Sequence, residues 1–284
     1  MGSRKVSLEN ARHQLEHRVQ PARWGLSILA RCGYVAKGVM YLLTGLLAAL
    51  TALHGGRTPP DSRGALEEIL SRPYGRGLLS MIALGLASYA IWGLVQAVKD
   101  TEHRGTTARG IVLRLGYAGK GVLYAGLAYS AVQLLSGLGG GANSEAVSKE
   151  WTARLLAEPF GRWLVGGVGG GIVAFALSQF YTAYTARFLG KLKRQEMEEP
   201  IDKVALWCGR VGLSARGVVF SLIGGFLLQA ALDVNAHDAR GLSGALRALE
   251  QPPLGPWILG VVAFGLGVYG LYMFVLARYR HISL

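Results

Sequence analysis

The sequence predicts an all-α, polytopic membrane protein in which six transmembrane helices form three parallel helical-hairpin repeats with pseudo-threefold symmetry. Three observations predict this fold class. The chain of 284 residues is 51% hydrophobic and 17% charged, with a mean hydropathy of +0.32, which is too apolar for an ordinary soluble domain. Six segments are long and apolar enough to cross a bilayer. One motif occurs three times along the chain.

The first repeat, residues 25–100, follows a basic tail, residues 1–24, that we expect in the cytoplasm. Its first span, residues 32–53, can cross about 30 Å of hydrocarbon as a helix and contains one cation, Lys37. Its second span, residues 77–98, carries no charge. Between the spans, "GALEEILS" has apolar residues at helical spacing before a proline, which predicts a short interfacial helix.

The second repeat, residues 108–190, and the third repeat, residues 204–280, follow the same plan. Their spans are residues 115–138 and 163–186 in the second repeat, and residues 211–232 and 254–277 in the third. The first span of each contains one cation, Lys120 or Arg216, and the second contains none. The segments "EWTARLLA" and "GALRALE" before the prolines again predict short helices between the spans.

The repeated motif lies at the start of each cation-bearing span. It reads "RCGYVAKGVMY" from Arg31, "RLGYAGKGVLY" from Arg114 and "RVGLSARGVVF" from Arg210. Each second span adds a glycine followed four residues later by an aromatic residue: Gly85 and Tyr89, Gly171 and Phe175, Gly265 and Tyr269. Agreement in both helices predicts an internal repeat, and because two spans return the chain to the same side, the three copies are parallel.

Small residues on these spans predict close helix packing. Within the first motif, Tyr34, Gly38, Tyr41 and Gly45 share one helical face, and glycine on a membrane helix lets a neighbouring backbone approach. The candidate packing residues are Gly38, Gly121, Gly217, Gly85, Gly171 and Gly265. The same glycine-rich faces would also suit a contact between copies of the chain, so a homo-oligomer is an open expectation.

The net charge of +13 is distributed unevenly between the two sides of the predicted bundle. With six spans, 18 of the 30 Lys and Arg residues lie on the side of the termini, and nine lie on the opposite side. Basic residues favour the cytoplasmic side, so we expect both termini in the cytoplasm and the protein in the bacterial inner (plasma) membrane. Because the basic excess follows the topology, no nucleic-acid partner is expected.

The cations inside the spans have two interpretations. In the first, each side chain extends back to the headgroups, next to the ordinary interfacial tyrosines. In the second, the three cations face a cavity on the cytoplasmic side and bind an anion or a lipid phosphate, because no carboxylate lies in the second spans to pair with them. The candidate ion- or lipid-binding residues are Lys37, Lys120, Arg216, Tyr41, Tyr124, Arg31, Arg114 and Arg210.

Catalytic chemistry is not indicated within the spans. They contain no nucleophile–base pair, paired carboxylates or metal-ligand cluster, so we expect no enzyme, cofactor or metal. The segment "HQLEH" at His13–His17 matches a zinc-peptidase pattern, but it lies in the tail without a third ligand, and we interpret it as a coincidence.

The three copies of the motif, each followed by a proline-glycine helix start, resemble the bacterial membrane-protein family DUF1206, a domain of unknown function. The resemblance covers about residues 25–280 and implies a six-span, three-repeat protein of the inner membrane with no established activity. The third copy departs from the pattern, because Leu213, Arg216 and Phe220 replace the first tyrosine, the lysine and the second tyrosine.

Two functions follow from these features. The first is a small channel or transporter for anions or anionic metabolites that uses the three cations. The alternative is a structural or accessory membrane protein that binds anionic lipid headgroups or a partner membrane protein through its basic face. The expected partners are therefore the lipid bilayer, its anionic headgroups and a small anion.

Overall fold

The computed structural model describes residues 2–54, 61–99, 107–138, 144–250 and 254–280. Within these ranges the chain is helical and contains no strand. The long helices are α1 (Gly2–His54), α3 (Gly75–Lys99), α4 (Ala108–Leu135), α6 (Gly161–Thr185), α7 (Glu199–Leu232) and α9 (Gly255–Tyr279). The short helices are α2 (Ser62–Leu70), α5 (Ser144–Leu156), α8 (Leu242–Leu249) and the 3₁₀ helices η1 (Arg187–Lys191), η2 (Arg194–Glu196) and η3 (Ala236–Asp238).

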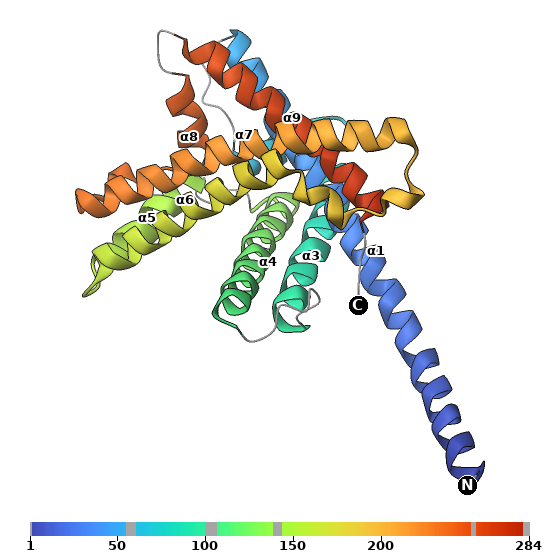
Figure 1. Cartoon of the computed structure of the whole chain (residues 1–284). Coiled ribbons are helices and arrows are strands. Elements are labelled where there is room, and N and C mark those ends of the chain that lie inside the picture. The colour runs from blue at the N-terminus through green and yellow to red at the C-terminus, as the bar shows by residue number, and fades with distance from the viewer. Residues whose placement is uncertain (1, 55–60, 100–106, 139–143, 251–253, 281–284) are drawn as a thin grey trace.

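The order of the helices follows the three sequence repeats. Each repeat has a long helix, a short helix and a second long helix: α1 to α3, α4 to α6, and α7 to α9. The short helices predicted before the prolines are confirmed as α2, α5 and α8. The expected tail belongs to α1, which begins at Gly2 and extends beyond the other helices in Figure 1; the side chains of residues 1–24 lie outside the described ones.

A glycine begins the second long helix of every repeat for a steric reason. A Cβ atom at Gly75, Gly161 or Gly255 would lie 2.2, 1.9 or 2.0 Å from a carbonyl oxygen at the end of the preceding short helix. In the first two repeats the residue before this glycine, Tyr74 or Phe160, has a positive φ of 64° or 67°. The tight reversal between short and long helix therefore requires the absence of a side chain at these three positions.

The long helices pack mainly between repeats (Figure 1). The most extensive contacts join α1 with α9, α3 with α4, and α6 with α7, so the second long helix of each repeat packs against the first long helix of the next. The pair α1 and α9 closes this cycle from the two ends of the chain. Within repeats, α1 packs against α3 and α7 against α9. These contacts place the long helices in the ring order α1, α3, α4, α6, α7, α9.

The ring is interrupted within the second repeat. Among the described residues, α4 and α6 share no interface comparable to those of α1 with α3 or α7 with α9, and Figure 1 shows α3 and α4 diverging from α6 and α7. The glycines at equivalent positions in the three repeats also differ in how closely the facing helix approaches them. A Cβ at Gly33 or Gly212 would lie 2.7 or 2.6 Å from an atom of the facing helix, but a Cβ at Gly116 would meet nothing within 4 Å. The three repeats are therefore not arranged with exact symmetry.

In the part of the chain that the structure describes, five helices are long and apolar enough to cross a membrane, which indicates a membrane protein. By length and composition, the candidate membrane-spanning segments are Ser27–His54 of α1, Gly75–Val98 of α3, Gly161–Thr185 of α6, Glu199–Leu232 of α7 and Gly255–Tyr279 of α9. The predicted span in α4 is not among them, so six spans are not confirmed. The physical reason is composition: α4 has the length but carries Arg114, Lys120 and three tyrosines, which lower its hydropathy.

A short connector between the second and third repeats folds against the end of α9. Leu192 forms a β-bridge with Arg280, and the Lys193 N–H donates to the carbonyl oxygen of Tyr279 at 2.8 Å. The ammonium group of Lys193 also donates to the carboxylate of Glu196 at 2.6 Å, and this hydrogen bond lowers the pKa of Glu196. The connector thereby holds η1 against α6, α7 and α9.

Candidate functional site

Lys37 on α1 faces the interior of the bundle, among aromatic rings. Its side chain is 5% exposed, and its Nζ donates to the hydroxyl of Tyr89 at 3.2 Å. The same Nζ lies 5.8, 5.0, 5.5 and 5.6 Å from the ring centroids of Tyr41, Tyr89, Tyr124 and Tyr269. A cation within about 6 Å of a ring centroid is attracted by the ring quadrupole. The ammonium therefore meets four tyrosine rings and a hydroxyl.

Arg216 on α7 occupies the equivalent position in the third repeat. Its Nη1 donates to the hydroxyl of Tyr269 at 2.8 Å, and its Cζ lies 4.5 Å from that ring's centroid. The rings of Phe220 and Tyr41 follow at 5.2 and 5.6 Å. The Nε of Arg216 is buried and has no hydrogen-bond acceptor among the described residues. One guanidinium donor thus points into the protein without an acceptor.

Lys120 on α4 takes the equivalent position in the second repeat. Its Nζ donates to Oε1 of Gln96 at 2.7 Å, and Gln96 is a buried residue of α3. The Nζ also lies 5.0 Å from each of the ring centroids of Tyr89 and Tyr117. Lys120 therefore contacts side chains of the preceding repeat and of its own helix.

Shared rings connect the three cations into one cluster. Tyr89 lies against both Lys37 and Lys120, while Tyr41 and Tyr269 lie against both Lys37 and Arg216. Lys37 is also within electrostatic reach of the other two cations. We call this group the cation–tyrosine cluster; its members are Lys37, Lys120, Arg216, Tyr41, Tyr89, Tyr124 and Tyr269.

Ring pairs repeat the same inter-repeat contact three times. Each aromatic residue that follows the cation by four positions meets the second-helix aromatic of the preceding repeat in an edge-to-face pair. The centroid distances are 4.7 Å for Tyr41 with Tyr269, 4.6 Å for Tyr124 with Tyr89 and 5.2 Å for Phe220 with Phe175. The cycle of helix pairs therefore has a matching cycle of aromatic pairs.

Five of the six candidate packing glycines have close neighbours. A Cβ at Gly38, Gly121 or Gly217 would lie 3.0, 2.9 or 2.8 Å from an atom of a helix in another repeat. At Gly85 and Gly265 it would lie 2.4 and 2.5 Å from the Cβ atoms of alanines on the facing helix of the same repeat. At Gly171, in the interrupted second repeat, it would meet nothing within 4 Å.

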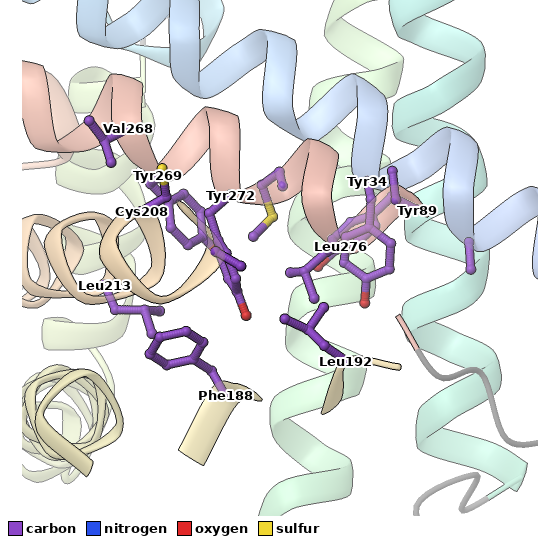
Figure 2. Close-up of a cluster of buried hydrophobic side chains, with 14 of the residues drawn as sticks. Tyr34, Tyr89, Phe188, Leu192, Cys208, Leu213, Val268, Tyr269, Tyr272 and Leu276 are labelled. Atoms are coloured by element: carbon purple, nitrogen blue, oxygen red, sulfur yellow. The ribbon is translucent and has the colours of Figure 1, made fainter. Parts of the chain in front are cut away.

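A cavity of about 250 Å³ adjoins the cluster. It is lined by Tyr34, Lys37, Tyr89, Gln179, Thr182, Arg187, Phe188, Leu213, Arg216, Tyr269, Tyr272, Met273, Leu276 and Arg280. Four of these described lining residues are cationic, and none is acidic. Figure 2 shows how Phe188, Leu192, Leu213 and Leu276 surround the same region as the tyrosines.

The lining also includes the polar side chains of Gln179 and Tyr272. Gln179 of α6 is 9% exposed, and Tyr272 of α9 is buried. Together with the Nε of Arg216, they supply hydrogen-bond donors to a concave site of positive charge. Such a site favours an anion because charge of one sign within low-dielectric walls attracts the opposite charge.

The first arginine of each motif lies outside this cavity lining. Arg114 donates from Nε to the carbonyl oxygen of Ala97 at 2.7 Å and from Nη2 to that of Val98 at 3.0 Å, so it caps the C-terminal end of α3. Arg31 and Arg210 are exposed at the surface. The structure therefore brings together Lys37 and Arg216 at the cavity, with Lys120, Tyr41 and Tyr124 in the adjoining cluster.

Sequence reasoning missed several lining residues. Tyr89 and Tyr269 were visible as repeated aromatic landmarks, and their common offset within the second spans was the signal that could have paired them with the cations. Arg187 and Arg280 carried no such signal, because they follow the ends of their spans and counted only as cytoplasmic charge. Their approach to the cavity depends on the fold of the connector.

The comparisons with known proteins agree with the repeat analysis. The family described as "Domain of Unknown Function (DUF1206)" matches three segments, residues 32–100, 115–186 and 211–280. "Uncharacterized protein YxxB" of Bacillus subtilis (strain 168) is similar, at 39% identity over 253 residues that cover 89% of this chain and 90% of that protein. The comparison with solved structures found no match.

Proposed function

Because the chain belongs to the DUF1206 family, whose function is unknown, we propose from its geometry that it binds an anion in the central cavity and passes it across the membrane. The observation that carries this proposal is the cavity lining, which holds four cationic side chains and no acidic one among the described residues. An anion relieves the mutual repulsion of these cations and accepts hydrogen bonds from their donors. The protein acts as a small channel or transporter for anions or anionic metabolites.

The proposed membrane arrangement has six spans, with α4 as the sixth. Support comes from the antiparallel packing of α4 along α3, because a helix that packs along a spanning helix shares its depth in the bilayer. Lys120 finds a hydrogen-bond acceptor in Gln96 and two aromatic rings, which offset the cost of placing its charge there. The termini then lie in the cytoplasm of a bacterial cell, and the protein lies in its plasma (inner) membrane.

Anion flux from liposomes tests the proposal. Purified protein is reconstituted into vesicles loaded with chloride, inorganic phosphate or a dicarboxylate, and efflux is compared with that of the variant Lys37→Gln/Lys120→Gln/Arg216→Gln. We expect vesicles with the unaltered protein to release at least one of these anions. The efflux rate with the triple variant should be at least tenfold lower. Helicity and gel-filtration profile show whether the variant remains folded.

A matched control removes three cations that do not line the cavity: Arg31→Gln/Arg210→Gln/Arg278→Gln. This control should retain the flux, because its cations are exposed at the surface. Equal losses in the two variants would assign the effect to general surface charge and contradict a binding role for the cavity.

Absence of flux for every anion would favour the alternative, an accessory membrane protein. One observation supports that role: 22% of the apolar window of α6 is buried within the protein, against 56% for α9. This exposed helix leaves apolar surface for a partner membrane protein or a second copy of the chain.

A further inference from the structure

We infer that the break between α4 and α6 is a lateral entrance to the cavity, and that its occupant is an anionic phospholipid of the surrounding bilayer. The headgroup phosphate lies at the cavity cations, and the acyl chains lie along the open faces of α4 and α6. The inference rests on the proposed function only in that the cavity binds an anion.

The position of the break relative to the cavity is the first argument. In the ring order α1, α3, α4, α6, α7, α9, the one neighbouring pair without an extensive interface among the described residues is α4 with α6. The cavity is lined by residues of α1, α3, α6, α7 and α9 together with η1 and Arg280, and by none of α4. The cavity is therefore open on the side between α4 and α6, where α4 contributes no lining residue.

The second argument comes from positions that the other repeats bury. Tyr89 and Tyr269 are each 3% exposed because they pack over Gly33 and Gly212 of their own repeats. Their equivalent, Phe175, is 44% exposed, and its counterpart Gly116 has open space. The second repeat thus has the equivalent aromatic residue and glycine, Phe175 and Gly116, but they do not pack against each other. The faces of α6 and α4 that carry them remain available to another molecule.

The third argument is the chemistry of the donors beside the opening. Gln179, on the α6 wall, is nine-tenths buried and lines the cavity, and the buried Nε of Arg216 has no acceptor among the described residues. Arg187 and Lys37 add positive charge to the same lining. The non-bridging oxygens of a phosphodiester accept from such amide, guanidinium and ammonium donors, whereas a zwitterionic headgroup brings an ammonium that the cations repel.

The size of the cavity fits the headgroup of a phospholipid but not its acyl chains. Pockets that bury a drug-sized molecule begin at about 300 Å³, and this cavity of about 250 Å³ is smaller. It accommodates a phosphate-bearing headgroup and excludes acyl chains. The chains find apolar surface outside it, where a Cβ at Gly116, Gly119 or Gly171 would meet no other atom within 4 Å.

Electron spin resonance with spin-labelled lipids tests this site. The full chain is reconstituted into phosphatidylcholine bilayers with a trace of spin-labelled phosphatidylglycerol or phosphatidylcholine of the same acyl length. We expect the motionally restricted fraction to favour phosphatidylglycerol at least threefold. Lys37→Gln/Arg216→Gln should abolish that preference, whereas Lys203→Gln/Arg278→Gln, at two exposed cations outside the cavity lining, should retain it.

A pair of glycine variants tests the route. Gly171→Leu places a side chain on the open face of α6, and Gly225→Leu places the same side chain at an exposed position of α7; a Cβ at either glycine has no neighbour within 4 Å. We expect Gly171→Leu to reduce the phosphatidylglycerol preference at least twofold and Gly225→Leu to leave it unchanged. Equal effects of the two variants would overturn the lateral route.

A soluble competitor identifies the source of the phosphate. Glycerophosphoglycerol carries the same headgroup without acyl chains and should not displace the labelled lipid at a hundredfold excess. Displacement would show that the site takes a free phosphodiester, and equal restriction of the two labelled lipids would overturn the inference. Anion flux by the unaltered protein together with equal restriction of the two labelled lipids would contradict this inference alone, whereas lipid preference without flux would contradict the proposed channel alone.

Discussion

At the scale of single residues, the environment of Lys37 contains more positive charge than stability alone would favour. A cation at the centre of a membrane costs about 2.5–3.5 kcal/mol on insertion scales, and a desolvated cation–π contact returns up to about 2 kcal/mol. The rings of the cation–tyrosine cluster offset this cost, but Lys120 and Arg216 repel Lys37 within the same cluster. The anion binding proposed above would relieve this repulsion among the three cations.

Replacing Lys37 with methionine tests whether the ammonium group stabilises the fold. The variant loses a hydrogen bond to Tyr89, worth about 1 kcal/mol, but it also removes a buried charge that has no carboxylate partner in the described residues. We expect Lys37→Met to unfold at the same temperature as the original protein or at a higher one, measured by tryptophan fluorescence in detergent. Tyr89→Ala, which removes a buried ring, serves as the destabilised reference.

A clear fall in the unfolding temperature of Lys37→Met, comparable to that of Tyr89→Ala, would assign a structural role to the ammonium group. In that case the cluster would stabilise the bundle, and the binding proposal would lose one of its supports.

At the scale of elements, the helices and their repeats could be predicted from the sequence, but their partners could not. Proline-glycine punctuation and charge-free stretches predict α3, α6 and α9, as well as the short helices before them. The packing of helices between repeats could not be predicted, because three similar hairpins have similar faces, and these faces can pair within a repeat or between repeats. Gly38 and Gly121 show the outcome: both face a helix of another repeat.

Alanine substitutions at equivalent glycines measure how the second repeat differs. At Gly265 the new Cβ would lie 2.5 Å from the Cβ of Ala215, so overpacking should cost about 1–3 kcal/mol. At Gly171 the new methyl group meets no neighbour, and alanine is the better helix former. We therefore expect Gly265→Ala to lower the unfolding temperature and Gly171→Ala to preserve or raise it.

Gly85→Ala extends this comparison to the first repeat and should behave like Gly265→Ala, because its Cβ would lie 2.4 Å from that of Ala36. If Gly171→Ala were as destabilising as these two, the second hairpin would be closed in solution.

At the scale of the whole molecule, the architecture depends on whether α4 spans the membrane. Hydropathy alone gives five crossing helices, which would place the two chain ends on opposite sides. The sequence repeats predict six, since α4 is the counterpart of α1 and α7. Sequence could not decide this point, because the residues that lower the hydropathy of α4 are satisfied by neighbours on α3 that only the folded chain supplies.

Cysteine labelling in cells distinguishes the two topologies. In a background of Cys32→Ala and Cys208→Ala, single cysteines replace His237 between α7 and α9 or Glu196 between α6 and α7. With six spans and cytoplasmic termini, a membrane-impermeant maleimide labels His237→Cys in intact cells and Glu196→Cys only after permeabilisation. The reverse pattern would show that α4 does not cross.

The pairing of α1 with α9 also determines when the protein can be completed during synthesis. Because a chain is made from its N-terminus, the first helix enters the membrane long before the ribosome reaches residue 255. Until then Lys37 lacks the ring of Tyr269, and the helix that packs most extensively against α1 does not yet exist. A nascent chain therefore carries an incompletely shielded ammonium group through most of its translation, and release before α9 leaves that charge without the ring of Tyr269.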